Sequence, residues 1–180
     1  MALHASAPDR WTLLTDLSLP GLPQVVPPVR ARVRAAVEEV LDDRELVEDV
    51  VLATAELLTN ALDHTRSGQD GGRVDLTVTL TPASAVLVEV TDQNGTDTHP
   101  RPTSGEALSD RGRGLHIVEA VSALWGVRSR PDRRTTVWFA TADRSASGRS
   151  VRVWGSAGAP DPGAPDTGAA ICTYQLGGSR

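Results

Sequence analysis

Glu56, Asn60 and His64 follow one another at intervals of four residues in the run AELLTNALDHT. If this run is helical, the three side chains lie along one side of the helix, because residues four apart are neighbours there. The amide oxygen of Asn60 is a ligand that Mg²⁺ accepts together with waters and phosphate oxygens. The Glu56 carboxylate, one turn earlier, could take a proton from an attacking hydroxyl group or orient it. The run is therefore either one wall of a catalytic site or a solvated helix face.

Hydrophobic periodicity by itself favours the solvated face. The apolar stripe of this helix is centred near Thr54, and Glu56, Asn60 and Asp63 fall on roughly the opposite side. Leu52 lies on that polar side and indicates that part of it is covered. His64 at the helix end is interpreted as an ordinary polar residue, and neither it nor His99 is included in the site.

Two further runs could bind a nucleotide. VEVTDQNG ends a predicted strand on Asp92 and continues into the turn-forming pair Asn94-Gly95, which presents a carboxylate beside backbone that can approach a flat ligand. GRGL places Gly112 and Gly114 at a predicted helix start, where unpaired N–H groups and the helix dipole favour a phosphate. Taken singly, an Asp-x-Asn-Gly run more often forms just a turn, and a Gly-x-Gly run before a helix is a weak signal that is also typical of a plain loop.

The elements that must position these residues follow the hydrophobic periodicity. They are predicted as a strand at 11–19, helices at 29–41 and from about 45 to 64, strands at 74–82 and 84–92, a polar segment at 94–111, a helix from about 113 through Leu124, and a strand at 135–142. Helices that do not alternate one for one with strands predict an α+β fold, a two-layer α/β sandwich with a mixed, mostly antiparallel sheet and helices on one face.

The length of 180 residues predicts one domain, at 10–142, followed by a tail at 144–180. The tail is rich in Ser, Gly, Ala and Pro and is predicted to be mostly disordered. The net charge is −5, and the basic residues are scattered, so direct nucleic-acid binding is not expected.

The residue types present exclude several kinds of site. The sequence contains no lysine, which excludes a lysine-dependent phosphate loop and a lysine Schiff base. Cys172 is the only cysteine, which excludes an intrachain disulfide and a Cys-based zinc cluster. No apolar run approaches the roughly 20 residues that span a bilayer. A cytoplasmic protein without membrane contact is expected.

In their order, these runs resemble the GHKL nucleotide-binding superfamily of histidine kinases, gyrase-type topoisomerases and heat-shock-90 chaperones. Four segments carry the resemblance: Glu56-x-x-x-Asn60 is similar to the N-box, Asp92 with Gly95 to the first glycine box, Gly112-Arg113-Gly114-Leu115 to the second, and TTVWF to the last strand motif. The runs AELLTNALDHT, RGRGLHIVEAVSALWGV and TTVWF are most similar to the anti-sigma-factor serine kinases and their actinobacterial relatives. The resemblance covers about residues 10–142.

The resemblance implies a Bergerat-type fold that binds ATP and Mg²⁺ between the second helix and a mobile lid. It implies that Asp92 hydrogen-bonds the adenine amino group, that Gly95 lets the backbone pass the ring, and that Asn60 binds Mg²⁺. The box that ends on Leu115 would cradle phosphates through Gly112 and Gly114. Glu56 would act as base toward a protein serine hydroxyl.

The resemblance also bears on an arginine and a threonine. Arg111 or Arg113 is the candidate for a phosphate contact, and an exposed loop charge is the alternative. Thr136 is the best match for an adenine-side hydroxyl. Two residues depart from the family's pattern. Asn94 stands where the first glycine box usually has glycine, and Arg134 stands where the last motif usually has a glycine before its threonine.

The leading hypothesis is an ATP-dependent serine/threonine protein kinase that acts on an anti-sigma-factor antagonist and could also sequester a sigma factor. A nucleotide-binding module that switches partners without chemistry is the alternative from a different class. A free-standing ATPase also stays open, as does a homodimer. A histidine-kinase fragment is disfavoured, because no helical hairpin with a phosphoacceptor histidine precedes the domain in this sequence.

Overall fold

The computed structural model describes residues 10–82, 84–93, 113–130, 132–141, 151–154 and 171–174, with backbone alone for 113–116 and the last two ranges. The elements of the main unit are β1 (Thr12–Pro20), the 3₁₀ turn η1 (Pro23–Val25), α1 (Val26–Glu38), α2 (Arg44–His64), the 3₁₀ turn η2 (Arg66–Gly68), β2 (Arg73–Leu80), β3 (Val86–Gln93), α3 (Arg113–Val121), β4 (Leu124–Ser129) and β5 (Arg134–Ala140).

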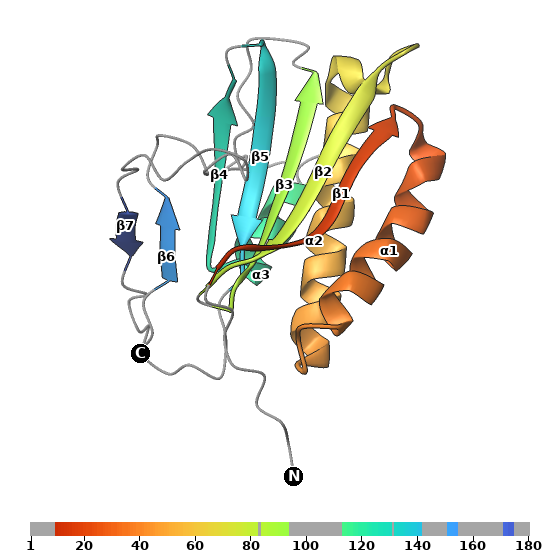
Figure 1. Cartoon of the computed structure of the whole chain (residues 1–180). Coiled ribbons are helices and arrows are strands. Elements are labelled where there is room, and N and C mark those ends of the chain that lie inside the picture. The colour runs from red at the N-terminus through yellow and green to blue at the C-terminus, as the bar shows by residue number, and fades with distance from the viewer. Residues whose placement is uncertain are drawn as a thin grey trace.

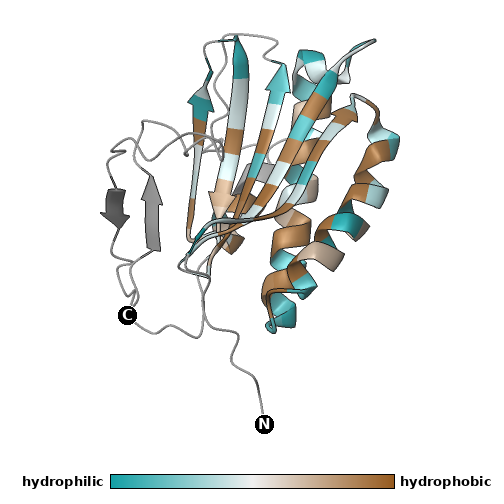
Figure 2. Cartoon of the chain, in the orientation of Figure 1, coloured by the Kyte–Doolittle hydropathy of each residue, from teal (hydrophilic) through white to brown (hydrophobic). Residues whose placement is uncertain are grey.

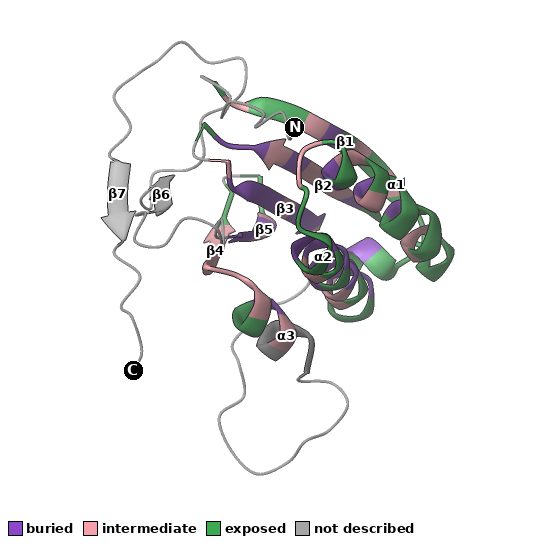
Figure 3. Ribbon diagram, turned by 90° about the horizontal axis from the view of Figure 1, so that it is seen from below, coloured by how far each residue is buried: buried purple, intermediate pink, exposed green. Residues whose placement is uncertain are grey.

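The sheet has five strands in the order β1-β2-β3-β5-β4, and each neighbouring pair is antiparallel. The helices lie on one face of this sheet, with α2 between α1 and α3 (Figures 1 and 3). The predicted α+β two-layer sandwich is confirmed, and the described sheet is antiparallel throughout rather than mixed.

The core lies between the sheet and the helices, and it is built from the alternate residues of each strand. Figure 2 shows the resulting alternation of hydrophobic and hydrophilic residues along the strands. Its fully or almost fully buried members include Val74, Leu76 and Val78 of β2, Val86, Val88 and Val90 of β3, Phe139 of β5, Val33 and Val37 of α1, and Val50 and Leu58 of α2. The strand residues between these ones lie on the other face, called here the open face.

Local sequence explains how the first two helices begin. Helix α1 starts at Val26, before the predicted Val29, because Pro27 and Pro28 fit the first turn, where no backbone N–H is needed for the helix ladder. Helix α2 is capped by Asp43, whose Oδ1 accepts hydrogen bonds from the N–H groups of Glu45 (2.9 Å) and Leu46 (3.2 Å). The cap fixes the register of the helix that carries Glu56 and Asn60.

The third predicted helix was too long. Helix α3 ends at Val121, and Leu124–Ser129 forms the edge strand β4, which pairs with β5. Gly126 lies opposite Trp138 in this pair, and a Cβ atom at Gly126 would lie only 2.9 Å from the Trp138 indole. The glycine therefore leaves room for the tryptophan ring across the strand pair.

Two further strands lie in the segment that the sequence predicts as a mostly disordered tail. Residues Val151–Trp154 (β6) pair antiparallel with Ile171–Tyr174 (β7) as a separate two-stranded sheet. The other residues of 144–180 lie outside the described ones. No helix among the described residues is long and apolar enough to cross a membrane.

Candidate functional site

Glu56 and Asn60 are half-buried on one flank of α2. At about 100° per residue, they lie about 80° and about 120° around the helix from Glu48. Glu48 forms an ion pair with Arg34 of α1, so it marks the side of α2 that faces α1. Glu56 and Asn60 therefore lie to one side of the strip of α2 that faces α1. They are neither solvated outright nor part of the core.

Asp92 lies near the end of β3 on the helix-covered face. It follows Val88 and Val90 at intervals of two residues, and those two are core residues. Its side chain is buried (5 % exposed), and among the described residues its Oδ1 atom has no hydrogen-bond partner. Burial raises the pKa of Asp92 to about 6, while the positive charge of Arg134 partly opposes that rise. A buried carboxylate oxygen without a donor fits a ligand that brings its own N–H group.

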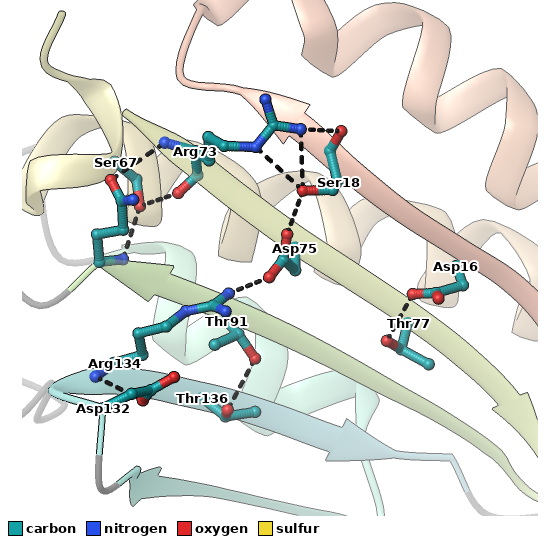
Figure 4. A network of polar contacts seen from close by, with 11 residues as sticks. Asp16, Ser18, Ser67, Arg73, Asp75, Thr77, Thr91, Asp132, Arg134 and Thr136 are labelled. Carbon is teal, nitrogen blue, oxygen red and sulfur yellow. Dashed lines mark hydrogen bonds and ion pairs between the residues drawn. The ribbon is translucent and has the colours of Figure 1, made fainter. Parts of the chain in front are cut away.

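Two neighbouring threonines of β5 lie on opposite faces of the sheet. Thr135 is the cross-strand partner of Asp92, on the face shared with Val137 and Phe139. Thr136 is the partner of Thr91 on the open face, and their hydroxyl oxygens are 2.8 Å apart (Figure 4). Thr136, the sequence-based choice, therefore lies on the face of the sheet opposite to that of Asp92. The spacing to Phe139 would have indicated Thr135, but Trp138 made the core face ambiguous.

Arg134, which departs from the family's pattern, begins β5 on the open face. Its guanidinium forms an ion pair with Asp75 of β2, two strands away across β3 (Figure 4). The left-handed conformation of this turn falls on Arg133 (φ 61°), and Asp132 accepts a hydrogen bond from the Arg134 N–H group at 3.2 Å. The turn before the threonines is thus formed without a glycine.

Part of the predicted site lies outside the described residues, namely Asn94, Gly95, Arg111 and Gly112. Arg113, Gly114 and Leu115 are in the first turn of α3, where the structure describes the backbone only. The described part of the site therefore consists of Glu56 and Asn60 on α2 and the strand pair of Asp92 and Thr135. Helix α2 packs against β3, which carries Asp92, and against α3.

Comparisons with known proteins agree with this architecture. Over 79 residues the chain is 34% identical to the uncharacterized protein SCO4941 of Streptomyces coelicolor, which covers 44% of this chain and 72% of that protein. The fold of the present chain is similar to that in a crystal structure of the RsbU and RsbW domains of Rv1364c from Mycobacterium tuberculosis, with a TM-score of 0.53 and 20% identity. That match covers 71% of this chain, and the chain spans about a third (32%) of the Mycobacterium protein.

The family comparison covers most of the unit just described, from the end of β1 onward. Residues 19–141 match the family described as the histidine kinase-like ATPase domain. The matched range contains α1 to α3 and β2 to β5, together with Glu56, Asn60, Asp92 and Thr135. The match confirms the superfamily that the sequence runs resemble, and the chain belongs to the histidine kinase-like ATPase domain family.

Proposed function

We propose that this chain binds Mg-ATP between α2 and the end of β3 and transfers the γ-phosphoryl group to a serine or threonine of a partner protein. The observation that carries the proposal is the buried Asp92 carboxyl, whose Oδ1 has no donor among the described residues. The adenine amino group is a donor of the kind this oxygen lacks. Thr135, opposite Asp92, takes the adenine-side place in the proposed site instead of Thr136.

The donors for a metal ion fit Mg²⁺ better than a metal that needs a full protein cage. Within the described ranges no group of three or more His, Cys, Asp or Glu side chains could hold an ion. Mg²⁺ usually takes one or two protein ligands and completes its shell with waters and phosphate oxygens. Asn60 supplies one such ligand in the proposal, and the bound ion would neutralise phosphate charge. Gly112 and Gly114 stay the expected phosphate contacts, with Arg111 or Arg113 as the positive side chain.

Glu56 is the proposed base. It lies one turn before Asn60 on the same flank, so a hydroxyl brought to the phosphate end would be within its reach. Its carboxylate would accept the hydroxyl proton while the oxygen bonds to phosphorus and ADP leaves. The proposed substrate is an antagonist protein of an anti-sigma switch, with a sigma factor as a further partner and the cytoplasm as the location. The similarity in fold to the RsbU and RsbW domains supports this choice.

Two measurements, made one after the other, test the proposal. Isothermal calorimetry with Mg-ATP on the full chain should show binding, and no binding would remove the whole assignment. A phosphoryl-transfer assay with a cognate partner should then show that Glu56→Gln lowers kcat by about 100-fold or more, while ATP affinity changes little. Glu48→Gln is the matched control on the same helix, because Glu48 faces Arg34 of α1. Turnover of Glu56→Gln at the level of Glu48→Gln would contradict the role of Glu56.

A partner-switching module without turnover is the second candidate. Arg134 favours it, because this residue replaces the expected glycine and engages Asp75 on the open face. In that case Glu56→Gln would leave both ATP affinity and ATP-dependent partner binding unchanged, and no phosphorylated partner would form. Steady phosphate release without any partner would instead indicate a free-standing ATPase.

A further inference from the structure

Two hydroxyl groups connect the end of α2 to the end of β3. Thr65 follows the last residue of α2, and its Oγ1 donates a hydrogen bond to the Ala61 carbonyl oxygen at 2.6 Å. The same Oγ1 accepts a hydrogen bond from the Ser67 N–H group at 3.0 Å. The Thr65 side chain thus ties the turn η2 to the last turn of the helix.

Ser67 continues the connection to the sheet. Its side chain is fully buried, and its Oγ donates to the Arg73 carbonyl oxygen at 2.6 Å and accepts from the Gln93 N–H group at 2.8 Å (Figure 4). The β2–β3 pairing runs only as far as Asp75 and Thr91, so Ser67 bonds Gln93 beyond the end of the paired stretch. Gln93 in turn accepts a bond from the Arg73 N–H group at 3.2 Å through its Oε1 atom.

The residues at the two ends of this connection are next in sequence to two residues of the proposed Mg-ATP site. Ala61 follows Asn60, and Gln93 follows Asp92. A continuous series of hydrogen bonds therefore runs from the phosphate end of the proposed site to its adenine end through Thr65 and Ser67. We call this series the Thr65–Ser67 relay.

The backbone around the relay is closely packed. A Cβ atom at Gly72 would lie 2.2 Å from the Ser67 carbonyl oxygen, and one at Gly68 would lie 1.9 Å from the Leu62 carbonyl oxygen. A Cβ atom at Gly21 would lie 1.5 Å from the same Ser67 oxygen. Three glycines thus allow η2 to pack closely against the end of α2 and against the segments that follow β1 and precede β2.

We infer that Thr65 and Ser67 are positioning residues, whose hydroxyls fix the spacing between Asn60 and Asp92 for a ligand that contacts both. The inference rests on the proposed function, and it adds which residues set the span of the site. A site held at the span of its ligand binds that ligand better than either of its halves alone, because less ordering remains to be done on binding.

The test compares a spanning ligand with two ligands that reach only one end. Calorimetry or NMR titration would measure ATP, adenosine and magnesium tripolyphosphate with the full chain and with Ser67→Ala. We expect ATP to bind about ten-fold more weakly to Ser67→Ala, since small displacements of positioned groups are costly. Adenosine and tripolyphosphate should change less than about two-fold, because each uses one end of the site.

Thr54→Val is the matched control. Thr54 Oγ1 also donates to a carbonyl four residues earlier in α2, that of Val50, at 2.7 Å, and it is likewise buried. It has no connection to β3 through this bond. Thr54→Val should therefore lower thermal stability without changing the affinity ratio between ATP and the two partial ligands.

Thr65→Val interrupts the relay at its other member and keeps the test decisive if Ser67→Ala fails to fold. It should reproduce the selective loss of ATP affinity. Equal ATP binding by the variants and the unaltered chain would overturn the inference, and so would an equal loss for all three ligands. If the unaltered chain binds neither ATP nor the partial ligands, the proposed function fails first and the inference fails with it.

Discussion

Asp92 of β3 lies directly opposite Thr135 of β5 on the helix-covered face of the sheet, whereas the adjacent Thr136 faces Thr91 on the open face. Adjacent strand residues point to opposite faces, so only one of the two threonines can share a ligand with Asp92. This relationship separates a binding role from a structural role at neighbouring positions.

The two threonines should respond differently to the same near-isosteric change. Thr135→Val should weaken ATP binding by about three-fold to ten-fold, which is the range for one net hydrogen bond. Thr136→Val should leave ATP binding unchanged and lower the free energy of unfolding by about 1 kcal/mol, because the buried Thr91 hydroxyl loses its partner. Calorimetry and urea unfolding measure the two effects, and the reverse pattern would place the ligand on the open face.

The buried Asp92 carboxyl should make stability depend on pH. Its folded-state pKa is raised from 3.8 to about 6, so the folded chain holds this proton more tightly than the unfolded chain does. The free energy of unfolding should therefore fall as pH rises from about 4 to about 6. Asp92→Asn should flatten this decline. Arg134→Gln should extend it to higher pH, because Arg134 lowers the pKa of Asp92.

The affinity for ATP should also depend on the protonation state of the Asp92 carboxyl. A carboxylate accepts a stronger hydrogen bond from an amino group than a neutral carboxyl does. Binding should therefore weaken as pH falls below about 6, and calorimetry across this range measures it. An affinity for ATP that does not change between pH 5 and pH 7 would mean that the Asp92 carboxylate makes no contact with adenine.

Close packing around η2 should make Gly21 intolerant of a methyl group. A Cβ atom there would lie 1.5 Å from the Ser67 carbonyl oxygen, so Gly21→Ala should cost more than about 2 kcal/mol of unfolding free energy. Gly71→Ala is the control, because its Cβ would meet nothing within 4 Å and the positive φ of 74° alone should cost about 1 kcal/mol. Chemical unfolding of both variants measures the difference, and equal losses would contradict the close contact.

The β4–β5 turn should become more stable with glycine at position 133. Arg133 has φ 61°, which glycine adopts without a steric penalty, so Arg133→Gly should raise the free energy of unfolding by about 0.5 to 1 kcal/mol. Arg130→Gly in the same turn should lower it instead, because Arg130 is not among the positive-φ residues. Denaturant midpoints measure both changes, and a loss of stability in Arg133→Gly would refute the expected relief.

The sequence predicted most of the main unit because its elements carry strong local signals. Helix α2 combines a long apolar stripe with an Asp43 cap, and β2 alternates apolar and polar residues along its whole length. The predicted bounds of β1, α2, β2, β3 and β5 differ from the observed ones by only a few residues. Helix α1 begins three residues before the predicted start at Val29. The prediction started too late because prolines in a first turn look like a break in the helix when only the sequence is considered.

Strand β4 was missed because its residues continue the spacing of the preceding helix. Leu124 follows Val121 and Val118 at helical intervals, so periodicity predicts one longer helix. The strand is decided by the ladder with β5, in which Gly126 accommodates Trp138. The apolar spacing of residues 118–124 does not by itself reveal this pairing, because strand formation depends on cross-strand packing.

The sequence by itself determined which residue types could bind a nucleotide and in what order they occur, with Glu56, Asn60 and Asp92 as the described members. Only the tertiary structure decided which face of the sheet each side chain lies on. That choice places Thr135 rather than Thr136 beside Asp92, because Val137 and Trp138 make both faces of β5 apolar. The Thr65–Ser67 relay also required the fold, since its longest-range hydrogen bond joins Gln93 to Ser67, 26 positions earlier, and these residues become neighbours only when η2 packs against β3.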